Sequence, residues 1–230
     1  MISTPYFAPP ADLLLWHYVT RLGEAGILLP LALAAVAWMV FGAGRGRDAL
    51  RWMLSLAAAG LLTTITKVAY IGWGYGIATL DFTGISGHAV SASGILPMLA
   101  WAALMHRGPR LQRAGVAAGF ALAALIAYSR LPVHAHSPVE VLCGFVLGSA
   151  VSIVSLRGLL DPWRPAPAVP IWLPALTVAG LALMPLYAPP VHTHEMVTAL
   201  SLQLSGHAKP YTRDDLRRRL QRDASAKALV

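Results

Sequence analysis

The sequence has little charge and a single cysteine. Only 12% of its 230 residues are Asp, Glu, Lys or Arg, about half the roughly 25% of an average soluble domain. The lone cysteine, Cys143, excludes an intrachain disulfide framework and a zinc site built from several cysteines. With so few charges to cover a surface, a water-soluble globular protein is not expected.

Long apolar runs take the place of charge. Hydrophobic residues make up 57% of the chain, and the mean hydropathy is +0.60. Runs of about 20 apolar residues are long enough to cross a bilayer as helices. We therefore predict an all-α polytopic membrane helical bundle of about six transmembrane helices, at residues 25–42, 49–67, 88–105, 111–128, 138–156 and 170–187.

The predicted spans divide the chain into three parts. Residues 1–24 form an N-terminal segment, in which 11–22 mix leucines with Asp12, His17 and Arg21, as is typical of a short helix at the membrane interface. Residues 25–187 form the six-helix membrane domain, and 188–230 form a basic C-terminal tail. Residues 1–10 carry no Lys or Arg, so a cleaved signal peptide is not expected.

Basic residues alternate between the connections. The first, third and fifth connections hold most of them, whereas the second and fourth contribute only Lys67 and Arg130. Connections rich in Lys and Arg face the cytoplasm. We therefore predict that the second and fourth connections and both termini face outward, in a bacterial-type inner membrane, where the polar site described next would face the periplasm or the outside.

The tail holds seven of the 18 basic residues and is expected to form a basic helix. One interpretation is contact with anionic lipid headgroups, and the other is a solvated terminal helix. We therefore attribute the net charge of +8 to the membrane topology and, in part, to a phosphate-binding site. No nucleic acid partner is expected. The sequence does not indicate an oligomeric state.

Polar residues gather where the second and fourth predicted spans end and where the third and fifth begin. Ionisable groups at membrane depth are costly and mark functional sites. Since these span ends share one side of the membrane, we expect a single outward-facing pocket that contains Lys67, Ser86, Gly87, His88, Arg130, His134, His136 and Glu140.

These residue types suit an anionic phosphate substrate. Lys and Arg hold phosphoryl oxygens, and Ser86 and Gly87 stand at a predicted helix start, where free N–H groups favour an anion. One imidazole can attack phosphorus while another gives a proton to the leaving oxygen. Glu140 follows His136 by four residues, so on a helix the two side chains would be neighbours.

Three short motifs lie in this region. Ser129, Arg130, His136 and Glu140 fit the pattern Ser-Arg, five residues, His, three residues, Asp, with Glu in place of Asp. Ser86, Gly87 and His88 form a Ser-Gly-His triplet that lacks a preceding proline. Lys67 begins the pattern Lys, six residues, Arg-Pro, but Gly74 and Tyr75 stand where Arg and Pro would be.

On these motifs the chain resembles the type 2 phosphatidic acid phosphatase family of membrane lipid phosphatases, over roughly residues 49–156. The resemblance implies that His136 forms a phosphohistidine, Glu140 orients it and His88 protonates the leaving group. It also implies phosphoryl contacts from Lys67, Arg130, Ser86 and Gly87. The expected substrate is a lipid phosphate or pyrophosphate, with membrane lipids as surroundings and no metal or other cofactor.

The missing arginine of the first motif leaves several alternatives. One charge-assisted hydrogen bond is worth roughly 1.5–3 kcal/mol, so its loss implies weaker activity, an unusual substrate, a substitute donor such as Tyr75 or a tail arginine, or no catalysis. A non-catalytic lipid-binding or transport protein and a lipid phosphotransferase are therefore alternatives. His134 with His136, or His192 with His194, could also be metal ligands, although so short a spacing is poor support.

Overall fold

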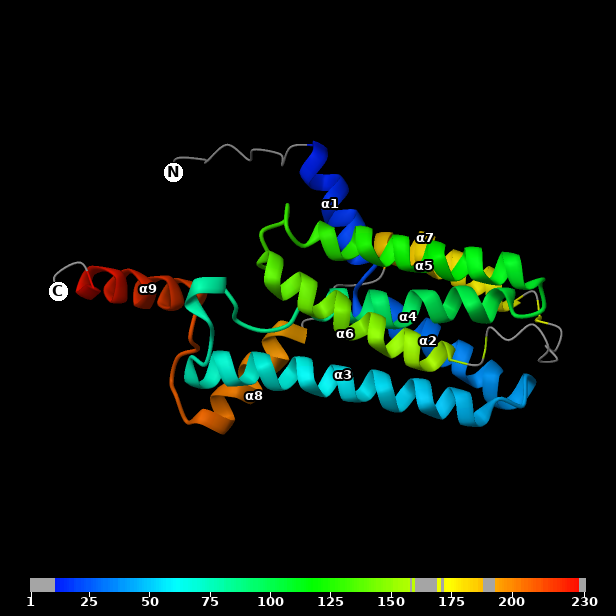
Figure 1. Cartoon of the computed structure of the whole chain (residues 1–230), viewed down its shortest axis with the longest axis horizontal. Helices are drawn as coiled ribbons and strands as arrows, with labels where there is room; N and C mark the ends of the chain where they lie inside the picture. Colours follow the sequence, from blue (N-terminus) through cyan, green and yellow to red (C-terminus); the bar gives the residue numbers. More distant parts are fainter. Residues whose placement is uncertain (1–10, 158, 160–168, 171, 188–192, 228–230) are drawn as a thin grey trace.

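The structure is a computed structural model that describes residues 11–157, 159, 169–170, 172–187 and 193–227. Residues 1–10, Arg164 and His192, which enter the sequence predictions, lie outside this range. The described helices (Figure 1) are α1 Ala11–Arg21, α2 Ala25–Ala37, α3 Gly46–Trp73, α4 Gly87–Leu104, α5 Pro109–Ser129, α6 Pro138–Leu156, α7 Trp172–Tyr187, α8 Thr193–Ser205 and α9 Arg213–Lys227. A π-helical turn, Trp38–Gly42, extends α2, and a 3-10 turn spans Ala78–Leu80.

Five stretches are long and apolar enough to cross a membrane, which confirms the predicted all-α polytopic membrane bundle. They are Leu13–Gly42, Gly46–Trp73, Gly87–Leu104, Pro109–Ser129 and Pro138–Leu156. The helix predicted at residues 11–22 is present as α1, which a turn at Leu22 and Gly23 separates from α2; its place at the membrane interface stays a prediction. Helix α4 lies at the centre of the bundle and packs against α2, α3, α5 and α6.

The sixth predicted span is a shorter helix. α7 has 16 residues, a length of ~24 Å at 1.5 Å per residue, against ~30 Å for the hydrocarbon core. It packs against α2, and a Cβ added at Gly180 would lie 2.7 Å from a methyl group of Leu31. α7 is therefore part of the bundle, and its described part is shorter than the hydrocarbon core is thick.

Helix α3 runs beyond its predicted end at Lys67 and continues to Trp73. Tyr70 and Ile71 in this extension are buried in a small apolar cluster with Leu216 of α9. The helix ends at Gly74, whose φ of +71° is a left-handed conformation that favours glycine. Tertiary packing on the C-terminal segment thus extends the helix past the point where its hydropathy falls.

Glycines bring α4 and α6 into close contact. A Cβ at Gly148 would lie 2.3 Å from the carbonyl oxygen of Val90 and 2.2 Å from Oγ of Ser93. Ser152 Oγ also donates to the carbonyl of Ser93 at 2.6 Å. This contact fixes the start of α4 against the start of α6, where the N–H of Ser86 donates to the carbonyl of Glu140 at 3.2 Å.

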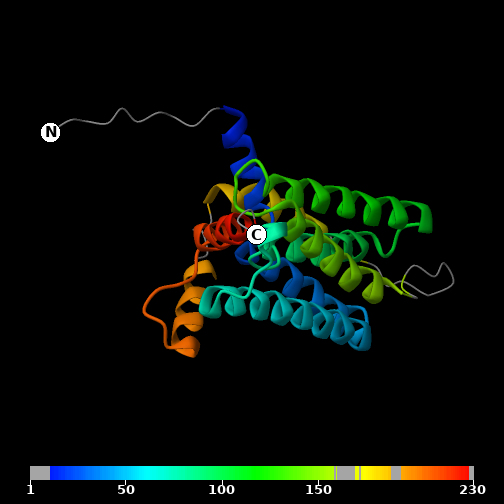
Figure 2. The same cartoon turned by 60° about the vertical axis from the view of Figure 1, so that its left-hand side comes forward.

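The connections that carry the predicted polar residues lie at one end of the bundle. Figure 1 shows the α3–α4 and α5–α6 connections at the end where α8 and α9 lie, and the α2–α3 and α4–α5 connections at the opposite end. Figure 2 turns the α9 end toward the viewer. The structure thus gathers at one end the segments that the predicted topology places outside.

We expect Gly148→Ala to destabilise the bundle, because the new methyl group would overlap Val90 and Ser93. Overpacking of this kind costs about 1–3 kcal/mol, so the midpoint of thermal unfolding in detergent should fall. Gly60→Ala in α3 is the matched control, since nothing lies within 4 Å of its Cβ position. An equal midpoint for the two variants would contradict the close α4–α6 contact.

The orientation can be tested by cysteine labelling in a Cys143→Ser background. Leu80 belongs to the α3–α4 connection and Leu200 to α8, two segments at the α9 end (Figure 1), and both side chains are exposed. Leu80→Cys and Leu200→Cys should therefore react with an impermeant maleimide added outside intact cells. Arg107→Cys, in the exposed α4–α5 connection, should react only after permeabilisation. Labelling of Arg107→Cys alone in intact cells would invert the predicted topology.

Candidate functional site

The start of α6 places Glu140 against His136. Ser137 is the N-cap, its Oγ accepts from the N–H of Glu140, and the Glu140 carboxylate accepts from the N–H of Ser137, which completes a capping box. His136 Nδ1 lies 2.7 Å from Oε2 of Glu140. The expected neighbours are therefore in contact, but the expected reason is wrong: His136 precedes the helix, and the capping box rather than helical spacing brings the pair together.

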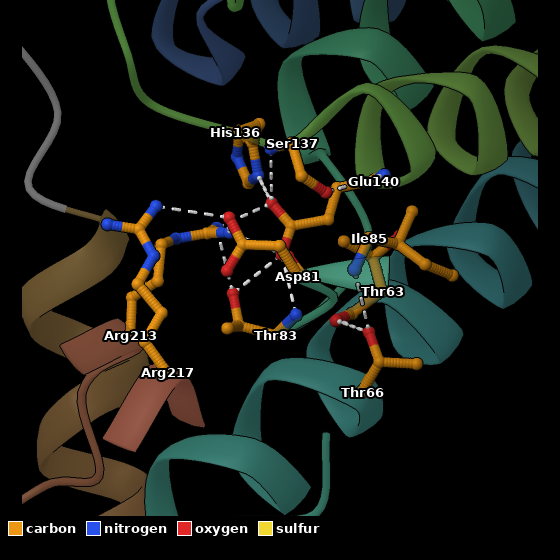
Figure 3. Close-up of polar contacts among 10 residues, drawn as sticks. All are labelled: Thr63, Thr66, Asp81, Thr83, Ile85, His136, Ser137, Glu140, Arg213 and Arg217. Carbon is orange, nitrogen blue, oxygen red and sulfur yellow. Dashed lines mark hydrogen bonds and ion pairs between the residues drawn. The ribbon is translucent and has the colours of Figure 1, made fainter. Parts of the chain in front are cut away.

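The Glu140 side chain is completely buried and fully hydrogen-bonded. Its Oε1 accepts from both N and Oγ1 of Thr83, each at 2.6 Å. Its Oε2 accepts from His136, from Ser137 at 3.1 Å and from Nη2 of Arg213 at 2.8 Å. Figure 3 shows these groups converging from the α3–α4 connection, the start of α6 and the start of α9. The carboxylate thus joins three distant segments of the chain.

The carboxylate fixes the tautomer of His136. A carboxylate only accepts hydrogen bonds, so Nδ1 of His136 carries the proton and Nε2 keeps a free lone pair. Burial lowers the pKa of His136 below its ordinary value, although the hydrogen bond to Glu140 opposes this shift. His136 is therefore a neutral imidazole at pH 7, with Nε2 available as a nucleophile or base.

A cavity of about 510 Å³ lies beside this pair. Four of the predicted site residues line it, namely Lys67, His88, Arg130 and His136. The remaining lining residues are Tyr70, Ile71, Thr83, Gly84, Ala135, Thr193, His194, Thr198, Pro210, Tyr211, Thr212 and Arg213. The structure thus brings these two cations and two histidines to one cavity, and the C-terminal segment forms much of its wall.

Ser86 and Gly87 stand at the start of α4 and are not among the residues that line the cavity. Ser86 is fully buried, and its Oγ has no hydrogen-bond partner in the described part of the chain. Gly87 begins α4, and its Cβ position would be 3.8 Å from Nζ of Lys67. The structure therefore places the start of α4 next to a cation, as expected for an anion site.

Arg130 connects the site to α1. Its Nη1 donates to Oγ1 of the buried Thr20 at 2.5 Å, while its Nε is buried without a partner among the described residues. Thr20 and Thr83 were missed by the sequence predictions. Thr83 precedes the Ser-Gly-His triplet closely, which is a weak signal, but no local pattern around Thr20 indicates a role in the site.

Two other sequence candidates, His134 and Tyr75, lie outside the cavity wall. His134 is exposed and has a φ of +53°, and Tyr75 is 73% exposed. Within the described ranges, no three His, Cys, Asp or Glu side chains are grouped to hold a metal ion. His194 does line the cavity, and its sequence partner His192 lies outside the described residues. Of the first pair, His134 lies outside the cavity wall and His136 lines it.

The C-terminal segment closes the end of α3. The last carbonyl groups of a helix have no partners within the helix. Here Ile71 accepts from the N–H of Tyr211 at 2.9 Å, Gly72 from Nδ1 of His207 at 2.7 Å and Gly74 from Nη1 of Arg219 at 3.1 Å. The predicted basic helix is thus present as α9, and its first turn is fixed at the cavity.

The fold and the site together define a polytopic α-helical membrane protein with a buried histidine–glutamate pair beside a cationic cavity. The chain is 32% identical over 205 residues to a protein of Klebsiella pneumoniae described as "Uncharacterized 22.5 kDa protein in cps region". The match covers 87% of this chain and 97% of the relative. The chain belongs to the same family as this Klebsiella protein. No family model and no solved structure matches it.

Proposed function

We propose that the protein is an integral membrane lipid phosphatase, which hydrolyses a lipid phosphate or pyrophosphate through a phosphohistidine intermediate at the outer membrane face. The observation that carries the proposal is the 2.7 Å contact between His136 Nδ1 and Glu140 Oε2 beside a cavity lined by Lys67 and Arg130. The motif resemblance supports the same reaction.

In this mechanism, Nε2 of His136 attacks phosphorus and the bond from phosphorus to the lipid oxygen breaks. His88, which also lines the cavity, gives a proton to the leaving oxygen. The deprotonated His88 then takes a proton from a water molecule as this water attacks the phosphohistidine, which releases inorganic phosphate and free His136 and restores His88. Glu140 stabilises the positive charge that develops on the His136 ring.

The phosphoryl oxygens need donors that are not already engaged. Lys67 and Arg130 form no ion pair within the described residues and line the cavity. Ser86 Oγ and Arg130 Nε are buried polar groups without partners among the described residues, and such groups are costly unless a ligand satisfies them. A bound phosphoryl group would supply the missing acceptor to Arg130, which lines the cavity.

Two alternatives remain open to test. Gly74 and Tyr75 in place of Arg-Pro favour a non-catalytic lipid-binding or transport protein on the same bundle. A phosphohistidine could also be discharged by a lipid hydroxyl in place of water, which would make the protein a phosphotransferase. Both alternatives use the same cavity, so product analysis is needed to separate them from hydrolysis.

Purified protein should release phosphate from at least one member of a panel that contains phosphatidic acid, phosphatidylglycerol phosphate, polyprenyl pyrophosphate and lipid A. His136→Ala should lose this activity, because it removes the nucleophile. His134→Asn is the matched control: His134 is exposed, outside the cavity wall and at a φ that Asn tolerates. Its activity should equal that of the wild type.

The result that would defeat the phosphatase is equal release by wild type and His136→Ala, or no release from any substrate. Vanadate should inhibit and a chelator should have no effect, whereas the reverse would favour metal catalysis. Phosphate found on a second lipid in place of free phosphate would identify a phosphotransferase.

The pH dependence should follow His136. Since burial lowers the pKa of His136, the nucleophile stays neutral below the ordinary histidine pKa of about 6.5. We expect kcat/KM to fall on the acid side with an apparent pKa below that value, because protonation removes the Nε2 lone pair. The apparent pKa of this acid-side fall in kcat/KM should be the same for monophosphate and diphosphate lipids. An apparent pKa above 7 would contradict this prediction.

A further inference from the structure

Arg213, the first residue of α9, reaches the carboxylate at the centre of the site. Its Nη2 donates to Oε2 of Glu140 at 2.8 Å and to Oγ1 of Thr83 at 3.1 Å. Its Nη1 donates to the carbonyl of Asp81 at 2.6 Å and lies 2.9 Å from Oδ2 of the same residue. A residue of the tail is therefore bonded both to Glu140 and to the α3–α4 connection.

Glu140 needs a positive partner. An ionised carboxylate is costly to bury unless it is hydrogen-bonded and its charge is compensated. The Glu140 side chain is 0% exposed, and His136 is neutral at pH 7. Among the described residues, Arg213 is the permanently charged group that is hydrogen-bonded to Glu140. It supplies the charge that His136 cannot supply before the reaction.

Arg213 also fixes where the carboxylate points. Oε2 accepts from Arg213, Ser137 and His136 together. The side chain of Arg213 is 26% exposed, and its other guanidinium nitrogen is held by Asp81. The guanidinium therefore cannot follow Glu140 into another rotamer without breaking its contacts with Asp81. A carboxylate held in this way keeps Oε2 directed at His136.

The anchoring of α9 keeps Arg213 in place. The preceding residue, Thr212, offers its carbonyl to the hydroxyl of Tyr70 and its N–H to Oδ2 of Asp215 at 2.8 Å. Tyr211 is bonded to Ile71 at the end of α3. The backbone on the N-terminal side of Arg213 is thus fixed to α3, so its side chain is directed to Glu140 by the same contacts that close that helix.

We propose that Arg213 is a positioning residue of the site, which compensates the charge of Glu140 and holds its carboxylate against His136. The C-terminal helix is then part of the catalytic unit, although it lies outside the 49–156 region that carries the motifs. This inference rests on the proposed function, since its effect on rate requires that His136 be the nucleophile.

The kinetic test compares Arg213→Gln with Arg218→Gln. Both variants remove one positive charge from α9, but Arg218 is 61% exposed and pairs with Asp215. Arg213→Gln should lower kcat by about 10- to 100-fold, as for loss of one charge-assisted contact, with KM changed less than about twofold. Arg218→Gln should match the wild type, and Arg213→Lys should recover part of the loss because it restores the charge.

A double variant separates positioning from direct phosphate binding. If Arg213 acts through Glu140, adding Arg213→Gln to Glu140→Gln should lower kcat no further. If Arg213 binds the phosphoryl group itself, the two losses should multiply, and KM and the vanadate inhibition constant should rise in Arg213→Gln. The second pattern would overturn the positioning role.

A spectroscopic readout keeps this inference separate from the phosphatase proposal. In NMR spectra of ¹⁵N-histidine-labelled protein, the His136 signals are those that are missing from the spectrum of His136→Gln. In the wild type and in Arg218→Gln, these signals should show the Nδ1–H tautomer of His136. Arg213→Gln should show a mixture with the Nε2–H tautomer. An unchanged tautomer in Arg213→Gln would refute the positioning role even if the enzyme is active, and a changed one would support it even if no lipid is hydrolysed. Should Arg213→Gln not fold, Arg213→Lys answers the same question with a smaller shift.

Discussion

The buried carboxylate of Glu140 is the constraint on which the arrangement of the site depends. A carboxylate in an apolar bundle requires hydrogen bonds from every side, and Glu140 receives them from Thr83, His136, Ser137 and Arg213. These donors come from the α3–α4 connection, the start of α6 and the start of α9. Satisfying one side chain therefore brings together the segments that form the cavity.

The bundle supplies the rigid base for this arrangement. The close α4–α6 contact through Gly144 and Gly148 holds the start of α4 near Glu140, and the extension of α3 provides the carbonyl groups on which the C-terminal segment docks. The loop between α3 and α4 is tied back to α3 by a hydrogen bond from the N–H of Ile85 to Thr66, at 3.1 Å. The polar cluster is thus held by helix ends rather than by free loops.

The sequence predicts the spans and much of the cluster because both depend on local properties. Hydropathy marks helices that face lipid, and rare ionisable groups at span ends indicate a shared pocket, so Lys67, His88, Arg130 and His136 could be predicted as neighbours. Thr20 could not, and Arg213 was anticipated only as an unspecified tail arginine, because their contacts arise from docking of α1 and α9 onto distant helices. The full length of α3 was missed for the same reason: Tyr70 and Ile71 gain their apolar partner from the tail.

The end of α3 explains why a cation reaches the site from the tail rather than from position 74. Gly74 has a left-handed φ of +71°, and a Cβ there would lie 2.8 Å from Nη2 of Arg219. An arginine at this position would be strained and would displace the contact through which α9 caps the helix. Arg213 is held by Asp81 and Glu140, whereas Lys67 and Arg130 have no ion-pair partner among the described residues. Arg213 and Arg217 therefore pair with the protein's own carboxylates, Asp81 and Glu140, and the other two cations that line the cavity pair with neither.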